Sequence, residues 1–146
     1  MKLYQQLIII TPVLLSCSLV QANGVRYPIR AFQIAPQQDL KAFNEHLKAV
    51  VSQYPSAKLP LDLLKRLPVE PAGHTKAYHW CGKVKAGQQI CTFREENIPD
   101  TSVVGVLQKI TFKSTSAGWY AANIERAWRC QPGKGESKSY QIQLCD

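Results

Sequence analysis

The two residues in this sequence that best suit acid–base catalysis are the histidines His46 and His79. His46 lies in a stretch with the apolar spacing of a helix and His79 in one that alternates like a strand, so folding could bring the imidazoles together. With a cationic phosphate clamp such as Lys48, Lys76 or Arg94, they would be the general acid and base of a small secreted hydrolase that cleaves a polyanion, like a metal-free nuclease. We favour the competing interpretation, in which His46 borders the apolar face of a helix and His79 packs on a sheet, because no motif fixes their geometry.

Other catalytic or metal-binding arrangements find little support. His74, His79 and Cys81, within HTKAYHWC, could bind copper or zinc, but Cys81 has a good disulfide partner and no fourth ligand is visible. The chain has no G-x-S-x-G nucleophile elbow, and the adjacent Glu95 and Glu96 are interpreted as part of a solvated loop. We therefore expect no metal and no cofactor, and we favour a non-enzymatic function over an enzymatic one.

Four cysteines beyond the N-terminal region indicate two disulfides. They form no C-x-x-C motif, and in an oxidising compartment their even number allows three connectivities; they are Cys81, Cys91, Cys130 and Cys145. If Cys81 faces Cys91 across a hairpin, Val84 meets Gln88 and the loop is 85–87, ending in a glycine that tolerates left-handed backbone. We therefore predict the pair 81–91 and, by elimination, 130–145.

The N-terminal residues predict export. MKLYQQ carries one lysine, and residues 7–20 form an apolar stretch that is too short for a membrane-spanning helix. We predict a signal peptide over residues 1–22, cleaved after Ala22, followed by a single domain over residues 23–146. The alternative is a lipoprotein signal over residues 1–16, because Leu14-Leu15-Ser16-Cys17 resembles a bacterial lipobox in which Cys17 carries lipid. The protein would accordingly be periplasmic or secreted, or in the alternative anchored to the outer membrane.

The elements that would position these residues begin with an edge segment and helices. Residues 23–36 alternate around a proline, as an extended edge segment would. Residues 36–55 have helical spacing between two prolines; the apolar positions are Leu40, Phe43, Leu47, Val50, Val51 and Tyr54. A shorter helix is predicted between Pro60 and Pro68, where the apolar positions are Leu61, Leu64 and Leu67.

From residue 77 the apolar spacing changes to the period of two that is typical of strands. The sequence predicts antiparallel strands over residues 77–84, 88–94, 103–113, 119–130 and 140–145. Helices followed by antiparallel strands indicate an α+β fold, with the long N-terminal helix and the short one packed on a curled sheet of about five strands. We expect the sheet's share of the core to come from Val104, Val106, Ile110, Phe112, Tyr120, Ala122, Ile124 and Trp128.

Net basicity is the remaining functional clue. The 18 lysines and arginines against 10 acidic residues give a formal charge of +8, which attracts anionic surfaces. In the alternating pattern of this strand, Tyr120 and Trp128 fall on the core face. Trp119 falls on the opposite face and suits an exposed contact. We expect an exported, non-enzymatic binding or assembly protein of the bacterial cell envelope, whose partner is a protein or an anionic envelope component. No motif supports nucleic-acid binding; the candidate binding residues are Trp119, Lys109, Lys113 and Arg129.

Overall fold

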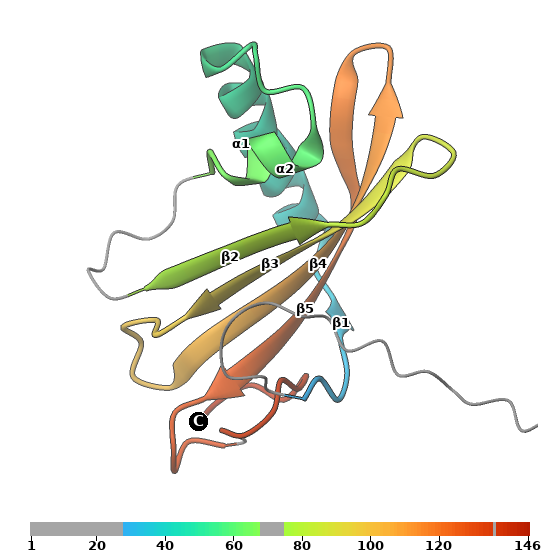
Figure 1. Ribbon diagram of the computed structural model, residues 1–146. Coiled ribbons are helices and arrows are strands. Elements are labelled where there is room, and N and C mark those ends of the chain that lie inside the picture. The colour runs from blue at the N-terminus through green and yellow to red at the C-terminus, as the bar shows by residue number, and fades with distance from the viewer. Residues whose placement is uncertain (1–27, 68–74, 136) are drawn as a thin grey trace, which may run out of the picture.

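The protein folds into a five-stranded antiparallel sheet with two helices on one face (Figure 1). The computed structural model describes residues 28–67, 75–135 and 137–146; its elements are β1 (Gln33–Ile34), α1 (Gln37–Gln53), α2 (Pro60–Leu64), β2 (Lys76–Cys81), β3 (Gln88–Glu96), β4 (Val103–Thr115) and β5 (Gly118–Cys130). β2 to β5 form a meander and β1 pairs with the outer edge of β5, so the strand order is β1-β5-β4-β3-β2. The predicted α+β class is confirmed. The predicted signal residues 1–22, Cys17 and His74 lie outside the described residues.

α1 forms where the helical periodicity predicts it. The helix begins directly after Pro36, whose fixed φ suits the start of a helix, and it ends just before Pro55. Leu47 and Val50 are buried against the sheet, and the other apolar residues of this face are partly buried beside them, except for Val51. The helical spacing includes Val51 in the apolar face, but its side chain lies at the border of that face and is 40% exposed.

Two polar links hold α1 against β5. The side-chain amide of Asn44 donates to the carbonyl oxygen of Ala121 at 2.9 Å and accepts from the N–H of Ala121 at 2.8 Å. β1 pairs only with Glu125 and Arg126 and does not reach Ala121. Asn44 therefore supplies the hydrogen-bond partners of the backbone N–H and carbonyl groups of Ala121 on this edge of β5. At the first turn of α1, Asp39 forms an ion pair with Arg126 at 2.5 Å. These links fix the distance between the helix and the strand.

The main core lies between the helices and the sheet. Three residues that the strand pattern assigns to it are fully buried, namely Ile110, Phe112 and Ile124. The helices supply Leu47 and Val50 from α1 and the buried leucines Leu63 and Leu64 from α2. This confirms the predicted packing of an amphipathic helix and a short helix on the sheet.

A β-bulge in β5 changes which residues face this core. Thr111 pairs with Asn123 but Phe112 pairs with Ala121, so Ala122 is an extra residue on β5. Because a bulge shifts the alternation of side chains by one residue, Trp119 faces the core and Tyr120 is 40% exposed. The prediction that Tyr120 is a core residue was therefore wrong.

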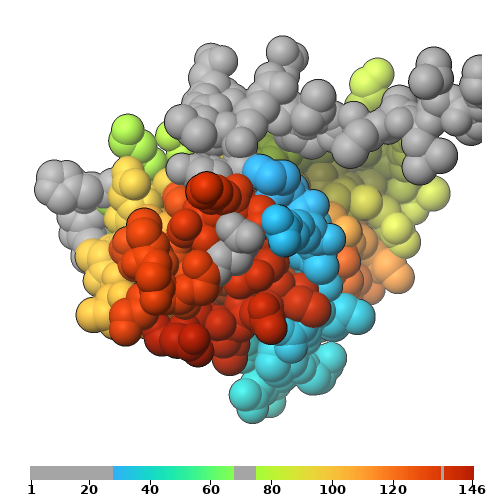
Figure 2. Space-filling model, turned by 90° about the horizontal axis from the view of Figure 1, so that it is seen from below, coloured from blue at the N-terminus to red at the C-terminus, as the bar shows by residue number. Residues whose placement is uncertain are grey.

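A smaller cluster lies on the opposite face of the sheet, where the C-terminal residues cross it. Leu107, Ala127 and Tyr140 are buried there. The predicted strand 140–145 does not form, because residues 140 and 141 pass between the N-terminal segment and the end of β5 and make one bridge to each side. The N–H of Tyr140 donates to the carbonyl of Pro28, and the Tyr140 carbonyl accepts from Arg30. Figure 2 shows the C-terminal residues beside the first described residues at this end of the molecule.

Both predicted disulfides are present. Cys81–Cys91 joins two directly paired residues of β2 and β3. Cys130–Cys145 ties the C-terminal residues to the end of β5. The two bonds therefore cross-link opposite ends of the sheet: one lies near the β2–β3 turn, and the other lies where the C-terminal residues cross the sheet.

The turn between β2 and β3 differs from the predicted three-residue loop. Lys85 pairs with Gln88, so the turn consists of Ala86 and Gly87, with φ of 47° and 70°. Two consecutive positive φ values are typical of a type I′ turn, whose twist matches that of the flanking strands. The predicted pairing of Val84 with Gln88 was wrong, because the extra residue lies before the turn, between Cys81 and Lys85.

Candidate binding site

The two candidate catalytic histidines lie on different parts of the fold. His46 is exposed on α1, which packs on β5, whereas His79 lies on β2 at the opposite edge of the sheet. The His79 ring stacks on Phe93 at 4.7 Å between centroids, and its Nε2 is buried with no hydrogen-bond partner among the described residues. Burial lowers the pKa of His79, and the positive charge of Lys65 lowers it further. No hydrogen bond or ring contact between described residues joins the two imidazoles, and the acid–base pair stays a hypothesis.

Two of the proposed phosphate clamps and the proposed metal ligand are engaged in other interactions. Lys48 forms an ion pair with Glu45 at 2.8 Å, and Arg94 lies beside the carboxylate of Glu96. Cys81 is bonded to Cys91. Within residues 28–67, 75–135 and 137–146, no three His, Cys, Asp or Glu side chains gather in a way that could hold a metal ion.

Glu96 is the centre of a buried charge cluster on the sheet face opposite the helices. Its Oε2 accepts a hydrogen bond from Nη2 of Arg129, its Oε1 accepts one from the hydroxyl of Tyr140, and Nε of Arg94 lies 3.8 Å from Oε1. All four side chains are buried, and we call them the Glu96 cluster. The prediction that Glu96 lies in a solvated loop was wrong, because Glu96 is the last residue of β3 and points toward the C-terminal crossing.

The Glu96 cluster fits around Gly105, which pairs with Glu96 on β4. A Cβ at this position would lie 2.9 Å from the hydroxyl of Tyr140 and 3.0 Å from Oε2 of Glu96, so only glycine leaves room for both groups. Burial raises the pKa of Tyr140 well above its ordinary value, and the hydrogen bond to Glu96 adds to this effect. The phenol therefore stays a donor, and the cluster anchors the C-terminal residues to the sheet.

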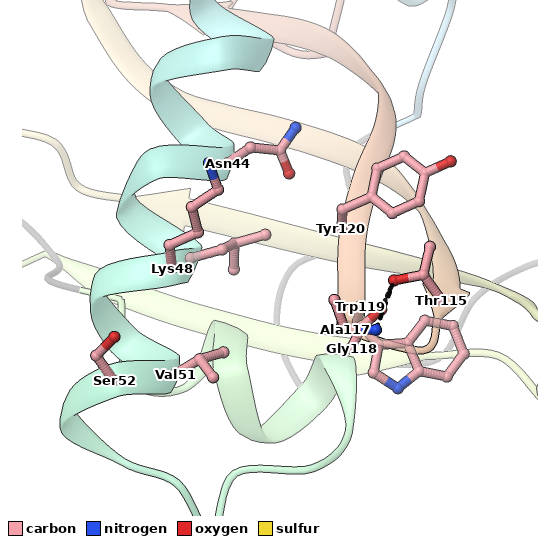
Figure 3. Close-up of a pocket in the computed structure, with 10 residues that line it drawn as sticks. Asn44, Lys48, Val51, Ser52, Thr115, Ala117, Gly118, Trp119 and Tyr120 are labelled. Atoms are coloured by element: carbon pink, nitrogen blue, oxygen red, sulfur yellow. Dashed lines mark hydrogen bonds between the residues drawn. The ribbon is translucent and has the colours of Figure 1, made fainter.

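A groove lies between α1 and the tip of the β4–β5 hairpin, and we call it the helix–hairpin groove (Figure 3). Its volume is about 450 Å³. One side of α1 forms the first wall and the hairpin forms the second; the lining side chains include Lys48, Val51, Ser52, Thr115, Trp119 and Tyr120. Asn44, which pins α1 to β5, lies at the end of the groove and sets its width.

The groove combines apolar walls with few polar groups that are free to bind. Trp119 packs partly against the core, and Val51 is directed toward the hairpin and half exposed. The hydroxyl of Thr115 already donates to the carbonyl of Gly118 at 3.0 Å and accepts from the N–H of Ala117 at 3.2 Å. The other polar side chains of the lining include those of Lys48, Ser52 and Tyr120, so the groove is suited to binding an apolar side chain between polar groups.

The predicted binding residues occupy three separate environments. Trp119 lines the helix–hairpin groove. Lys109 lies on the other face of the sheet, where its Nζ forms an ion pair with Glu125 at 2.8 Å, and Lys113 is exposed on that same face. Arg129 is buried within the Glu96 cluster. The structure does not bring the four side chains together, and their role in binding stays a prediction.

Comparison of the chain with protein-family models, with curated proteins and with solved structures found no match. In the part of the chain that the structure describes, no helix has the length and apolar character needed to cross a bilayer. The functional argument therefore depends on the geometry of the helix–hairpin groove and of the surfaces around it.

Proposed function

We propose that the protein is an exported, non-enzymatic binding protein that holds an apolar segment of a protein partner in the helix–hairpin groove. The observation that carries this proposal is a groove of about 450 Å³ that exposes Val51 and part of Trp119. Mainly apolar pockets of this size are typical of binding sites, and tryptophan often dominates binding energy. The two disulfides support export, because such bonds persist in oxidising compartments.

The charges around the groove favour an acidic partner. The chain carries a formal charge of +8, and Lys48 stands at the groove rim. The ion pair between Lys48 and Glu45 is exposed, so water and salt already weaken it and an acidic group of a partner can replace Glu45 at little cost. We expect the partner to place an apolar side chain against Trp119 and Val51 and an acidic side chain near Lys48.

Site-specific photo-crosslinking in the producing cells tests this proposal. A benzophenone side chain introduced at Val51 lies in the groove, whereas one introduced at Leu144 is exposed at the C-terminal end and serves as a matched control. We expect a discrete adduct with one acidic protein from position 51 and none from position 144. Combining the position-51 probe with Trp119→Ala or Lys48→Glu should remove the adduct.

The fold of each variant is checked by near-ultraviolet circular dichroism. Equal adducts from positions 51 and 144 would show that the capture is not specific to the groove. An adduct from position 51 that survives both Trp119→Ala and Lys48→Glu would place the binding surface elsewhere.

A further inference from the structure

The sheet face opposite the helices ends in a row of basic and polar side chains. Lys85, Gln88, Lys113 and Tyr120 are successive cross-strand partners from the β2–β3 turn to β5, so their side chains project from the same face. Phe112, the neighbour of Lys113, is buried under the helices, which places the row on the opposite face. We call these four residues the lysine row.

The lysine row is exposed and its charges are not neutralised within the described fold. Lys85 and Lys113 form no ion pair with any residue in the described ranges, whereas Lys109 on the same face is paired with Glu125. A large apolar side chain stands beside the lysines: Ile90 occupies the next position of that face of β3 and is 52% exposed. The end of the sheet therefore presents cations and apolar groups together.

Hydrogen bonds make this end of the sheet one surface rather than two independent hairpin tips. The N–H and the hydroxyl of Ser114 both donate to the carbonyl of Gly87, at 2.9 and 3.2 Å. Lys85 and Gln88 exchange two backbone hydrogen bonds across the turn. The spacing of Lys85 and Lys113 along the backbone is therefore set by the fold, and little backbone entropy is lost when both lysines bind the same surface.

From this arrangement we infer that the lysine row docks the protein on an anionic lipid bilayer, with Ile90 and Tyr120 entering the interfacial layer. Tyrosine rings favour the headgroup level, and each lysine close to such a surface strengthens binding about fivefold. A nucleic acid or an acidic polysaccharide would attract the lysines but offers no apolar layer for Ile90. The inference goes beyond the groove-binding proposal and does not depend on it.

The lysine row and the helix–hairpin groove meet at Tyr120, which is exposed and also lines the groove. The bulge at Ala122 places Trp119 on the side of the main core and Tyr120 on the opposite face of β5. A protein docked through the lysines would therefore hold Trp119 and α1 on the far side of the sheet from the lipid.

Vesicle cosedimentation tests the inference. The oxidised protein is produced by export in a Cys17→Ala background, which excludes an attached lipid, and is mixed with vesicles of phosphatidylglycerol and phosphatidylethanolamine or of phosphatidylcholine alone. We expect binding to the anionic vesicles only, and Lys85→Gln with Lys113→Gln should weaken it about 25-fold. The matched control is Lys76→Gln with Lys134→Gln, which removes the same charge at the other end of the sheet and should change binding less than about twofold.

A further variant separates docking from simple charge attraction. Ile90→Ser keeps the charge and should weaken vesicle binding roughly threefold, because its apolar side chain no longer enters the interface. Absence of vesicle binding, equal losses in the two lysine double variants, or full binding by the serine variant would each overturn the inference. Binding of an acidic protein through the lysine row without vesicle binding would overturn it as well. None of these outcomes affects the crosslinking test of the groove.

Discussion

Replacing Glu96 by glutamine removes the only carboxylate of the Glu96 cluster while keeping the size of the side chain. The side chains of Glu96 and Arg129 are 11% and 9% exposed, so water screens their interaction weakly. The amide can still accept from Tyr140, but Arg94 and Arg129 lose the buried negative charge that faces them in the Glu96 cluster. Breaking a buried ion pair from one side costs about 3–5 kcal/mol, and we expect Glu96→Gln to lower the free energy of unfolding by this amount.

Equilibrium unfolding of the oxidised protein in urea, followed by tryptophan fluorescence and extrapolated to water, measures this loss. The matched control is Glu45→Gln, which removes the same charge from the exposed pair with Lys48 and should leave the unfolding curve unchanged. If Glu96→Gln were as harmless as Glu45→Gln, the Glu96 cluster would not hold the C-terminal residues, and the reasoning from burial would be refuted.

Three further predictions concern packing, the helix position and pH. Gly105→Ala should destabilise the protein by about 1–3 kcal/mol in the same urea assay, because the new methyl group meets the hydroxyl of Tyr140; an unchanged midpoint would contradict this. Asn44→Ala should cost about 2 kcal/mol, since both bonds to the backbone of Ala121 are lost; retained stability would show that they are dispensable. Folding lowers the pKa of His79, so the unfolded chain binds its proton first as the pH falls through 6.5 and stability decreases there. His79→Leu should flatten that part of the stability–pH curve, and a curve of unchanged slope would rule out this contribution.

Most of the fold could be predicted because each element carries its own local pattern. The periodicity of residues 36–55 and the prolines at its ends define α1, and the change to a period of two at residue 77 marks the strands. The cross-strand position of Cys81 and Cys91 predicts the first disulfide, and elimination leaves the second. These inferences depend on neighbours along the chain, which is why they succeed without tertiary information.

The faces of Trp119 and Tyr120 could not be predicted, because they depend on a single extra residue in β5. Alternation along the strand assigns Tyr120 to the core, but the bulge at Ala122 reverses the assignment beyond it. The neighbouring Ala121 is held by Asn44, which lies 77 positions earlier in the chain. A contact between such distant residues leaves no local signal in the sequence.

The candidate site could be predicted only in part. The alternation of β5 predicts an exposed Trp119 that suits binding, whereas the structure places this residue on a groove wall that α1 completes. The Glu96 cluster was missed, because its members come from β3, β5 and the C-terminal segment and only the fold brings them together. The pairing of Glu96 with Gly105 indicates room for the cluster only once the register of β3 and β4 is known.

The affinity of the crosslinked partner, measured by isothermal titration with the oxidised protein and two variants, tests the central claim most directly. Trp119→Ala removes the largest apolar side chain of the helix–hairpin groove, and Ile34→Ala removes an apolar side chain that is exposed on the edge strand β1. We predict that Trp119→Ala raises the dissociation constant by roughly 30-fold or more and that Ile34→Ala leaves it unchanged. Equal dissociation constants for all three proteins, with the fold of each retained, would contradict the assignment of the groove as the binding site.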